Sequence, residues 1–249
     1  MLRSNDRVSN KTFVLVSFII QSGVNKEILG IFIHVPKIAG TSFQNYLRDY
    51  GVRLVRPNPA WIGHLTAQQT IDLLESDLSL QQHLGDTVRL FALTREPNFW
   101  MQSLYNYALT SSPMVSGLNY EHTFFEASSI NQYYLDFIKF NSVKKLSRTS
   151  RLWSYNKLSM RPLWKYYAIR YQNKKERRKY VLKTFNLKNI DKAIHEILDG
   201  SCDFDISEFE FKTQKIYNTS RKVINAQVTD QSLKRMVQLI HVGDTDIIF

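Results

Sequence analysis

From residue 30 to residue 42 the chain reads GIFIHVPKIAGTS, an apolar run followed by a polar segment that contains Gly40. The run from Gly30 to Val35 is typical of a strand that is buried on both faces of a parallel sheet, and Pro36 ends it. Four apolar or aromatic residues then recur at helical spacing: Phe43, Tyr46, Leu47 and Tyr50. Gly51 follows them and is suited to closing a helix. This part of the chain therefore predicts a strand, a loop and a helix.

The same order of elements recurs further along the chain. Thr66 and Gln69 have the spacing of a capping box, which predicts a helix that begins after Thr66. A second apolar run, Val88 to Leu93, predicts another buried strand, and Pro97 suits the first turn of the helix that follows. Two strand–loop–helix units predict an α/β fold: a single domain with a P-loop-like parallel β-sheet flanked by helices.

The rest of the chain is divided by composition and apolar spacing. We assign residues 1–27 to an N-terminal tail or accessory packing segment, and residues 28–249 to the domain, with a basic aromatic insertion at about 144–183. The further expected elements are an aromatic-rich helix at 121–140, a helical or irregular arm at 144–183, a short helix at 189–198, a brief strand at Asp203–Ile206, and a last helix that Thr229 caps and Gly243 ends.

The charge of the chain points to an anionic partner. Its 33 Lys and Arg residues against 22 Asp and Glu give a net charge of +11. Fourteen of the basic side chains lie between Lys144 and Lys183, where Glu176 is the single acid. Aromatic residues interleave with them, which leaves two interpretations open: a solvated face, or an acceptor site that stacks a sulfated or uronic sugar beside charge. Nucleic acid is a less favoured partner.

The expected compartment is the cytoplasm. Cys202 is the single cysteine, which excludes an intramolecular disulfide and any Cys-rich zinc site. Basic residues precede the apolar run from Phe13 to Ile20, as in a signal peptide, but the run is shorter than the about 20 residues that span a bilayer, and no A-x-A-like cleavage site follows it. An integral membrane span is therefore not expected, and export or membrane anchoring through this run is the alternative.

The loop between the first strand and its helix has the features of a phosphate site. Such a loop brings backbone N–H groups and the positive end of a helix dipole to one point. It differs from a Walker P-loop, in which the Lys directly precedes the Ser or Thr, because Lys37 stands four residues before Thr41. The position of this Lys therefore disfavours a P-loop kinase. A second reason against a kinase is that no recognisable Mg²⁺-binding acid follows a strand.

Residues 33–43 read IHVPKIAGTSF, and residues 94–107 read TREPNFWMQSLYNY. The first segment resembles the 5′-phosphosulfate loop of the sulfotransferases that use 3′-phosphoadenosine 5′-phosphosulfate (PAPS), in particular the branch of heparan sulfate 2-O-sulfotransferase and related bacterial carbohydrate sulfotransferases. The second resembles that family's 3′-phosphate motif, in which Arg95 at a strand end is followed eight positions later by Ser103. Residues 216–249 resemble the family's closing pattern, so the resemblance covers both ends of the domain.

The resemblance implies transfer of a sulfuryl group from PAPS to a hydroxyl of a carbohydrate. The expected partner is thus a glycan or another hydroxylated acceptor, which includes anionic acceptors. The residues that would hold the donor are Lys37, Ala39, Gly40, Thr41 and Ser42 at its 5′-phosphosulfate, Arg95 and Ser103 at its 3′-phosphate, and Arg221 and Lys222 over the nucleotide. His64, next to Gly63, falls where this branch carries its catalytic base. Lys37 would also stabilise the departing phosphate oxygen, and no metal is expected.

The chain departs from the family pattern at Ile38, where a Thr or Ser usually follows the loop Lys, so one contact to the donor is missing or replaced. It has no long N-terminal stem, which makes it more similar to the short bacterial type. His34 is expected to pack or hydrogen-bond beneath the loop. The alternative function is a non-catalytic protein that binds a polyanion or nucleic acid on a P-loop-like fold, and Ile38 leaves room for it.

Overall fold

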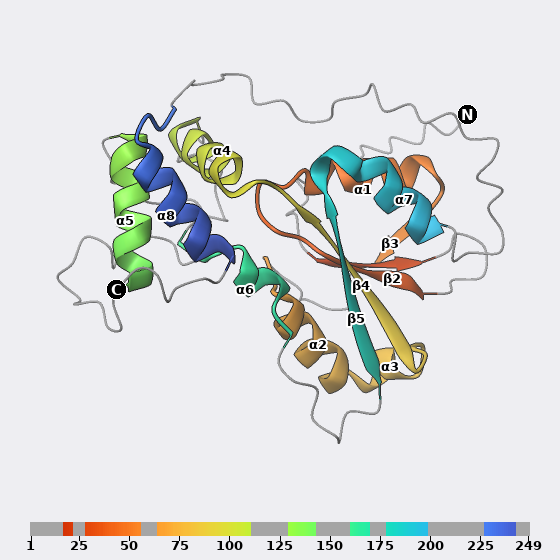
Figure 1. Ribbon diagram of the computed structural model, residues 1–249. Coiled ribbons are helices and arrows are strands. Elements are labelled where there is room, and N and C mark those ends of the chain that lie inside the picture. The colour runs from red at the N-terminus through yellow and green to blue at the C-terminus, as the bar shows by residue number, and fades with distance from the viewer. Residues whose placement is uncertain are drawn as a thin grey trace, which may run out of the picture.

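The computed structural model describes residues 17–21, 28–55, 64–110, 129–142, 160–169, 178–198 and 227–242, with the backbone alone at 107–110. These residues form one five-stranded sheet in the order β3-β1-β2-β4-β5 with helices around it (Figure 1). The strands are β1 (Phe18–Gln21), β2 (Ile28–Ile33), β3 (Arg53–Val55), β4 (Thr87–Thr94) and β5 (Lys179–Asn186).

The sheet is mixed, which corrects the prediction of a parallel sheet. β2 runs parallel to β4, with Ile31 opposite Leu90, and β4 runs parallel to β5. β1 runs antiparallel to both β2 and β3. The two strands that the apolar runs predict are therefore parallel neighbours, as a pair of strand–loop–helix units requires, while the antiparallel half of the sheet comes from two short strands outside those runs.

β1 lies within residues 1–27, the segment that we assign to a tail or accessory packing segment. Phe18, Ile19 and Ile20 are each at most 1% exposed, and β1 occupies an inner position of the sheet. The apolar run from Phe13 to Ile20 thus ends in a core strand, at least from Phe18 onward.

Helices cover both faces of the sheet. α1 and α7 lie on one face, and α2 and α3 lie on the other (Figure 1). The helices are α1 (Gly40–Asp49), α2 (Ala67–Ser76), α3 (Leu78–Gln81), α4 (Pro97–Thr110), α5 (Ile130–Ser142), α6 (Trp164–Tyr167), the 3₁₀ helix η3 (Leu187–Asn189), α7 (Ile190–Leu198) and α8 (Gln231–Val242).

The core has two parts, one on each face of the sheet. Alternate strand residues feed them: Phe32 and Phe91 belong to the part that includes α1 and α7, whereas Ile31 and Leu90 belong to the part that includes α2. The predicted burial of the β2 and β4 runs on both faces is confirmed. Gly30 is required for this packing, because a Cβ there would lie 2.3 Å from the Phe91 ring.

The helix starts follow local side-chain chemistry. The capping box of Thr66 and Gln69 is present as predicted, and Pro97 is the first residue of α4, where Glu96 accepts hydrogen bonds from two backbone amides. The prediction that Thr229 caps the last helix is wrong. Asp230, one residue closer to the helix, caps α8. Its carboxylate accepts hydrogen bonds from the backbone amides of Ser232 and Leu233.

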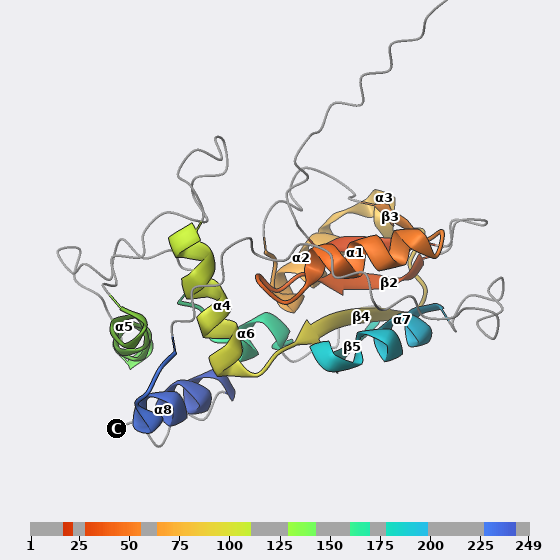
Figure 2. The same cartoon turned by 90° about the horizontal axis from the view of Figure 1, so that it is seen from above.

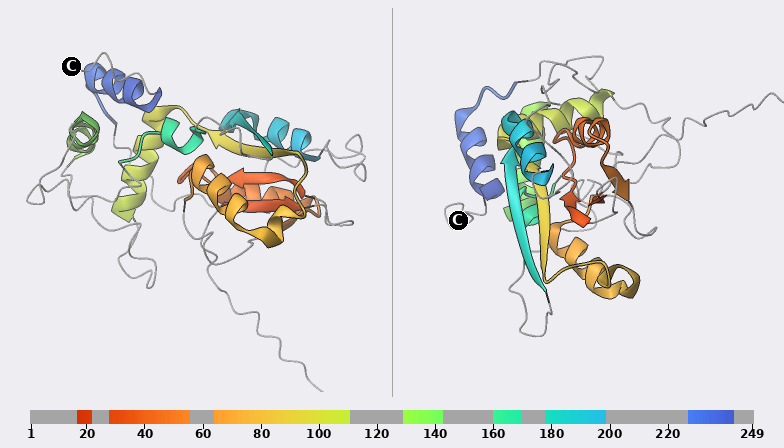
Figure 3. Two further views of the ribbon diagram at one scale, coloured as in Figure 1. Left: turned by 90° about the horizontal axis from the view of Figure 1, so that it is seen from below. Right: turned by 90° about the vertical axis from the view of Figure 1, so that its right-hand side faces the viewer.

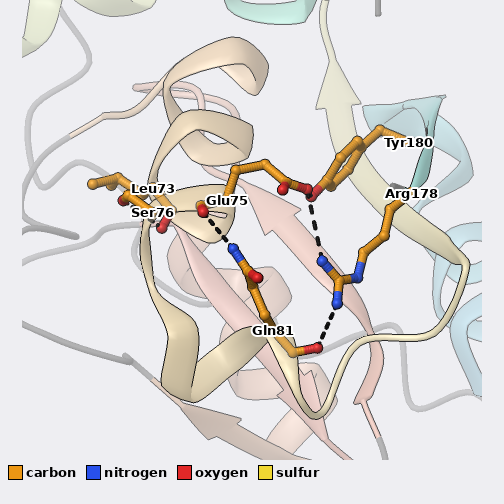
Figure 4. Close-up of polar contacts among 6 residues, drawn as sticks. All are labelled: Leu73, Glu75, Ser76, Gln81, Arg178 and Tyr180. Atoms are coloured by element: carbon orange, nitrogen blue, oxygen red, sulfur yellow. Dashed lines mark hydrogen bonds and ion pairs between the residues drawn. The ribbon is translucent and has the colours of Figure 1, made fainter. Parts of the chain in front are cut away.

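The arm at 144–183 is not wholly helical or irregular, which corrects that prediction. Its last residues begin β5, which pairs with β4 along eight residues. Arg178 and Tyr180 fasten the start of this strand to Glu75 of α2, and Arg178 also donates to the Gln81 carbonyl at 2.6 Å (Figure 4). At least these two residues of the arm therefore stabilise the fold. The basic composition of the arm does not predict this role.

α4, α5 and α8 form a three-helix group beyond the carboxyl end of β4, and Figure 2 shows the group from above. α6 lies between this group and α2 (Figures 1 and 3). The predicted strand at Asp203–Ile206 and the predicted stop at Gly243 lie outside the described residues, as does the first part of the helix predicted at 121–140.

Candidate functional site

The candidate site lies where β2 and β4 end. Because these neighbouring strands are parallel, their carboxyl ends meet at the same edge of the sheet. The loop that contains Lys37 follows β2, and Arg95 follows β4 directly. The two predicted motifs are therefore brought together by the strand pairing itself.

The loop after β2 has a strained backbone. Lys37 and Ala39 have φ angles of 59° and 48°, in the left-handed region that costs an ordinary residue about 1–2 kcal/mol. Ala39 in this conformation precedes Gly40 at the start of α1, and a left-handed residue followed by a right-handed one turns successive N–H groups toward one point, a concavity that binds anions. Ala39 offers no side-chain cap, and the first turn of α1 holds no acid.

Two buried contacts fix this loop, one apolar and one a hydrogen bond. Ile38 is 1% exposed and belongs to the core, so it is a buried packing residue. On the other side of Lys37, the Pro36 carbonyl accepts a hydrogen bond of 2.7 Å from the Trp100 indole N–H of α4. The loop is thus fastened from inside on both sides of Lys37.

His34 lies beneath the loop, as predicted. Its side chain is 2% exposed, and a Cβ on Gly40 would come within 1.9 Å of its Nε2. Its backbone N–H donates to the Ser17 hydroxyl at 3.2 Å. Gly40 is therefore needed so that α1 can begin directly over the imidazole ring.

His64 reaches the same loop from the segment before α2. Its Nδ1 lies 3.1 Å from the His34 carbonyl oxygen, and the two imidazole rings lie 4.6 Å apart between centroids. A carbonyl oxygen only accepts, so Nδ1 carries the proton and Nε2 of the neutral ring carries the lone pair. The half-buried imidazole is thereby held in the tautomer whose Nε2 is able to take up a proton.

Lys37 and Arg95 are electrostatically coupled. Burial lowers the pKa of Lys37, and the nearby Arg95 guanidinium lowers it further. Burial also lowers the pKa of Arg95, while Glu96 opposes that effect. Because an arginine stays protonated, the repulsion between the two cations falls on the lysine. An anion placed between them would relieve both the repulsion and part of the desolvation cost.

The other predicted donor contacts are placed less fully. Thr41 and Ser42 lie half-buried in the first turn of α1. Ser103 lies half-buried on α4, one turn beyond Trp100 on the same side of the helix, and that side meets the loop through Pro36. The remaining predicted residues, Arg221, Lys222 and Gly63, lie outside the described residues.

Sequence reasoning missed two residues that build the site. Ser17 supports the His34 backbone, and Trp100 supports the loop. A Trp inside the second motif was a usable signal, since a buried indole N–H requires an acceptor, but the sequence does not identify that acceptor. Ser17 carries no comparable signal, because a single hydroxyl within the apolar run from Phe13 to Ile20 does not identify its partner.

The described residues contain no group of three His, Cys, Asp or Glu side chains that would hold a metal ion. No helix in this part of the chain combines the length and the apolar character needed to cross a membrane.

No protein-family model matches the sequence, and neither a curated protein nor a solved structure is significantly similar to it. The chemistry of the site must therefore be argued from its own residues.

Proposed function

We propose that this protein is a PAPS-dependent sulfotransferase, which transfers a sulfuryl group to a hydroxyl of a carbohydrate. The observation that carries the proposal is the coupling of two half-buried cations, Lys37 and Arg95, from the ends of two neighbouring parallel strands. A nucleotide with phosphates at both its 3′ and 5′ positions suits two neighbouring cations, one of them in a strained loop.

In the proposed complex, the 5′-phosphosulfate meets Lys37 and the backbone N–H groups at the start of α1, together with the Thr41 and Ser42 hydroxyls. The 3′-phosphate meets Arg95, whose planar guanidinium suits bidentate contact with phosphate oxygens, and Ser103 on α4. The Ile38 side chain is buried in the core, so the donor loop would rely on its backbone where the related enzymes offer a hydroxyl.

The reaction would be an in-line displacement at sulfur. The acceptor oxygen forms a bond to sulfur, its proton passes to Nε2 of His64, and the bond between sulfur and the phosphate oxygen breaks. 3′-Phosphoadenosine 5′-phosphate (PAP) departs with the electron pair of that bond. Lys37 stabilises the negative charge on the departing oxygen, and the hydrogen bond to the His34 carbonyl stabilises the protonated imidazole.

The segment at 160–169 is the proposed acceptor side. The Tyr167 hydroxyl donates to the Leu93 carbonyl at 3.1 Å, which fastens this segment two residues before Arg95. Trp164 is 37% exposed, and the Lys165 ammonium lies 5.6 Å from the centroid of the indole ring. An exposed indole near a cation is suited to stacking a sugar ring that carries a negative charge.

A thermal-shift titration tests the proposal against its rivals. PAP should raise the Tm of the protein with a saturable dose dependence, and ATP with Mg²⁺ should raise it less. Arg95→Met should lose the shift by PAP, whereas Arg89→Met, which changes an exposed arginine of β4, should keep it. A preference for ATP would favour a kinase. A shift by polyanions without a shift by PAP would favour the non-catalytic alternative.

A further inference from the structure

Trp100 has an unusual position in this protein, because its two ends meet different parts of the fold. Its Nε1 donates to the Pro36 carbonyl at 2.7 Å, 64 residues earlier in the chain. Its ring lies edge-on to His241 of α8, with centroids 5.1 Å apart and planes at 88°. The Trp100 side chain is completely buried. One indole thus connects the loop that contains Lys37 to the last helix.

His241 is held just as firmly on its other sides. Its Nδ1 accepts a hydrogen bond of 3.0 Å from the Leu163 backbone N–H, directly before α6. Its ring stacks on Phe137 of α5 at 4.6 Å between centroids, and it is 2% exposed. The imidazole therefore joins α5, α6 and α8, and it fixes the surface against which the indole of α4 packs.

The conformation of the loop requires such a support. Lys37, directly after Pro36, is in the left-handed region, as is Ala39. Strained residues of this kind persist only where the surroundings hold them, and such strain is often part of a ligand site. A hydrogen bond to the carbonyl directly before Lys37 fixes the peptide plane from which the left-handed turn begins, because that carbonyl and the N–H of Lys37 share one planar unit.

We propose that Trp100 and His241 are positioning residues, which hold the Lys37 loop in its anion-binding conformation through the contact of Trp100 with the Pro36 carbonyl. His241 acts on the loop through Trp100. As a consequence, α8 and the α6 segment are coupled to donor binding although neither contains a predicted donor contact among the described residues. The part of this inference that concerns donor binding rests on the proposed function, whereas the part that concerns the loop does not.

The experiment measures hydrogen exchange and nucleotide binding on the full chain. The amides of Ile38 and Phe43 are useful probes, because they donate to the carbonyls of Val35 and Ala39 within the loop and at its exit. In Trp100→Phe, which removes the indole N–H and keeps a ring, both amides should exchange at least about tenfold faster in the ligand-free protein. The affinity for PAP should fall about tenfold.

A matched control separates positioning from a general loss of stability. Ile71→Val removes one buried methyl group of α2 in the other part of the core, and it should lower the Tm through a site that does not contact the loop. We expect this variant to leave the exchange of the two loop amides and the affinity for PAP unchanged. Equal acceleration of the loop amides in Ile71→Val and Trp100→Phe would overturn the proposal.

A double-mutant cycle tests whether His241 acts through Trp100. His241→Asn keeps an acceptor near the position of Nδ1 and removes the ring, and alone it should also accelerate the loop amides. In the Trp100→Phe background it should add no further acceleration, and full additivity would refute the relay. If the wild type does not bind PAP, the proposed function fails, and the exchange measurements still decide the inference about the loop.

Discussion

Burial lowers the pKa of Lys37, in the loop that follows β2, and the Arg95 guanidinium directly after β4 lowers it further. The two residues are 58 positions apart in the sequence, and the parallel pairing of β2 with β4 brings them to one edge of the sheet. Folding thus brings two like charges together and partly desolvates them. This costs stability in the ligand-free protein, and a bound anion would recover it.

Removing the Lys37 charge should therefore stabilise the free protein and abolish its response to PAP. Lys37→Met keeps a long side chain without the ammonium, and it should raise the Tm by about 2–4 °C, as about 1 kcal/mol does in a domain of this size. Differential scanning calorimetry with and without PAP checks both parts. Lys188→Met, which changes an exposed lysine of η3, should leave the Tm and the response to PAP unchanged. A lower Tm for Lys37→Met would show that the ammonium is stabilising in the free protein.

The same coupling sets a pH dependence. Because the pKa of Lys37 is lower in the folded than in the unfolded chain, the unfolded chain binds more protons between those two values. Stability in this alkaline window should therefore rise with pH through the contribution of Lys37. Urea unfolding of the wild type and Lys37→Met at several alkaline pH values measures the difference, and identical pH profiles would contradict the coupling.

His64 should be required for turnover and not for donor binding. His64→Asn keeps a donor that is able to reach the His34 carbonyl, but it has no basic nitrogen at the position of Nε2. We expect kcat to fall by about 10²–10⁴-fold, the usual range for a general base, with the Kd for PAP within about twofold of the wild type. The measurement is sulfuryl transfer from labelled PAPS to a glycan panel. His83→Asn, at an exposed histidine, should be neutral, and full activity of His64→Asn would exclude the assigned role.

Gly40 should tolerate no side chain. Its Cβ would lie 1.9 Å from Nε2 of His34, so Gly40→Ala must displace either the ring or the start of α1. We expect a loss of about 1–3 kcal/mol, typical of overpacking, together with weaker binding of PAP. Gly85→Ala is the matched control, because a Cβ at Gly85 meets nothing within 4 Å. Denaturant unfolding of both variants checks the prediction, and equal stability of the two would contradict the packing.

His241 should make the fold sensitive to acid. Burial lowers the pKa of His241 from 6.5 to about 3. Between these values the unfolded chain takes up a proton that the folded chain does not, so stability falls as the pH decreases, by up to about 1.4 kcal/mol per pH unit. In urea unfolding between pH 7 and pH 4, His241→Asn should show a shallower decrease than the wild type. His83→Asn should follow the wild type, and parallel profiles for all three proteins would refute the assignment.

Much of the half of the fold around the site could be predicted from the sequence. The β2 and β4 runs, the capping box at Thr66 and Pro97 at the start of α4 each carry a local signal, since apolar runs and capping residues act over a few positions. Two successive strand–loop–helix units also imply that the carboxyl ends of their strands are neighbours. This is why the sequence alone predicts that Lys37 and Arg95 lie at the same edge of the sheet.

The rest depends on contacts between distant parts of the chain. β1 and β5 are short or alternately exposed strands whose partners decide their conformation, so neither their apolar pattern nor their charge identifies them. The support of the loop by Trp100 and the packing of His241 against Trp100 join residues that are far apart in the sequence. The left-handed conformation of Lys37 and Ala39 also cannot be predicted from the sequence, because Lys and Ala adopt it only where tertiary contacts impose it.

In the proposed complex, one nucleotide is held at both of its phosphorylated ends by residues at the two strand ends. Isothermal titration of PAP, adenosine 5′-monophosphate and adenosine 3′-monophosphate to the wild-type protein measures whether both ends contribute to binding. PAP should bind at least about tenfold more tightly than either monophosphate, because only PAP is able to engage both Lys37 and Arg95. Equal affinity for PAP and one of the monophosphates, or no binding of PAP, would contradict it.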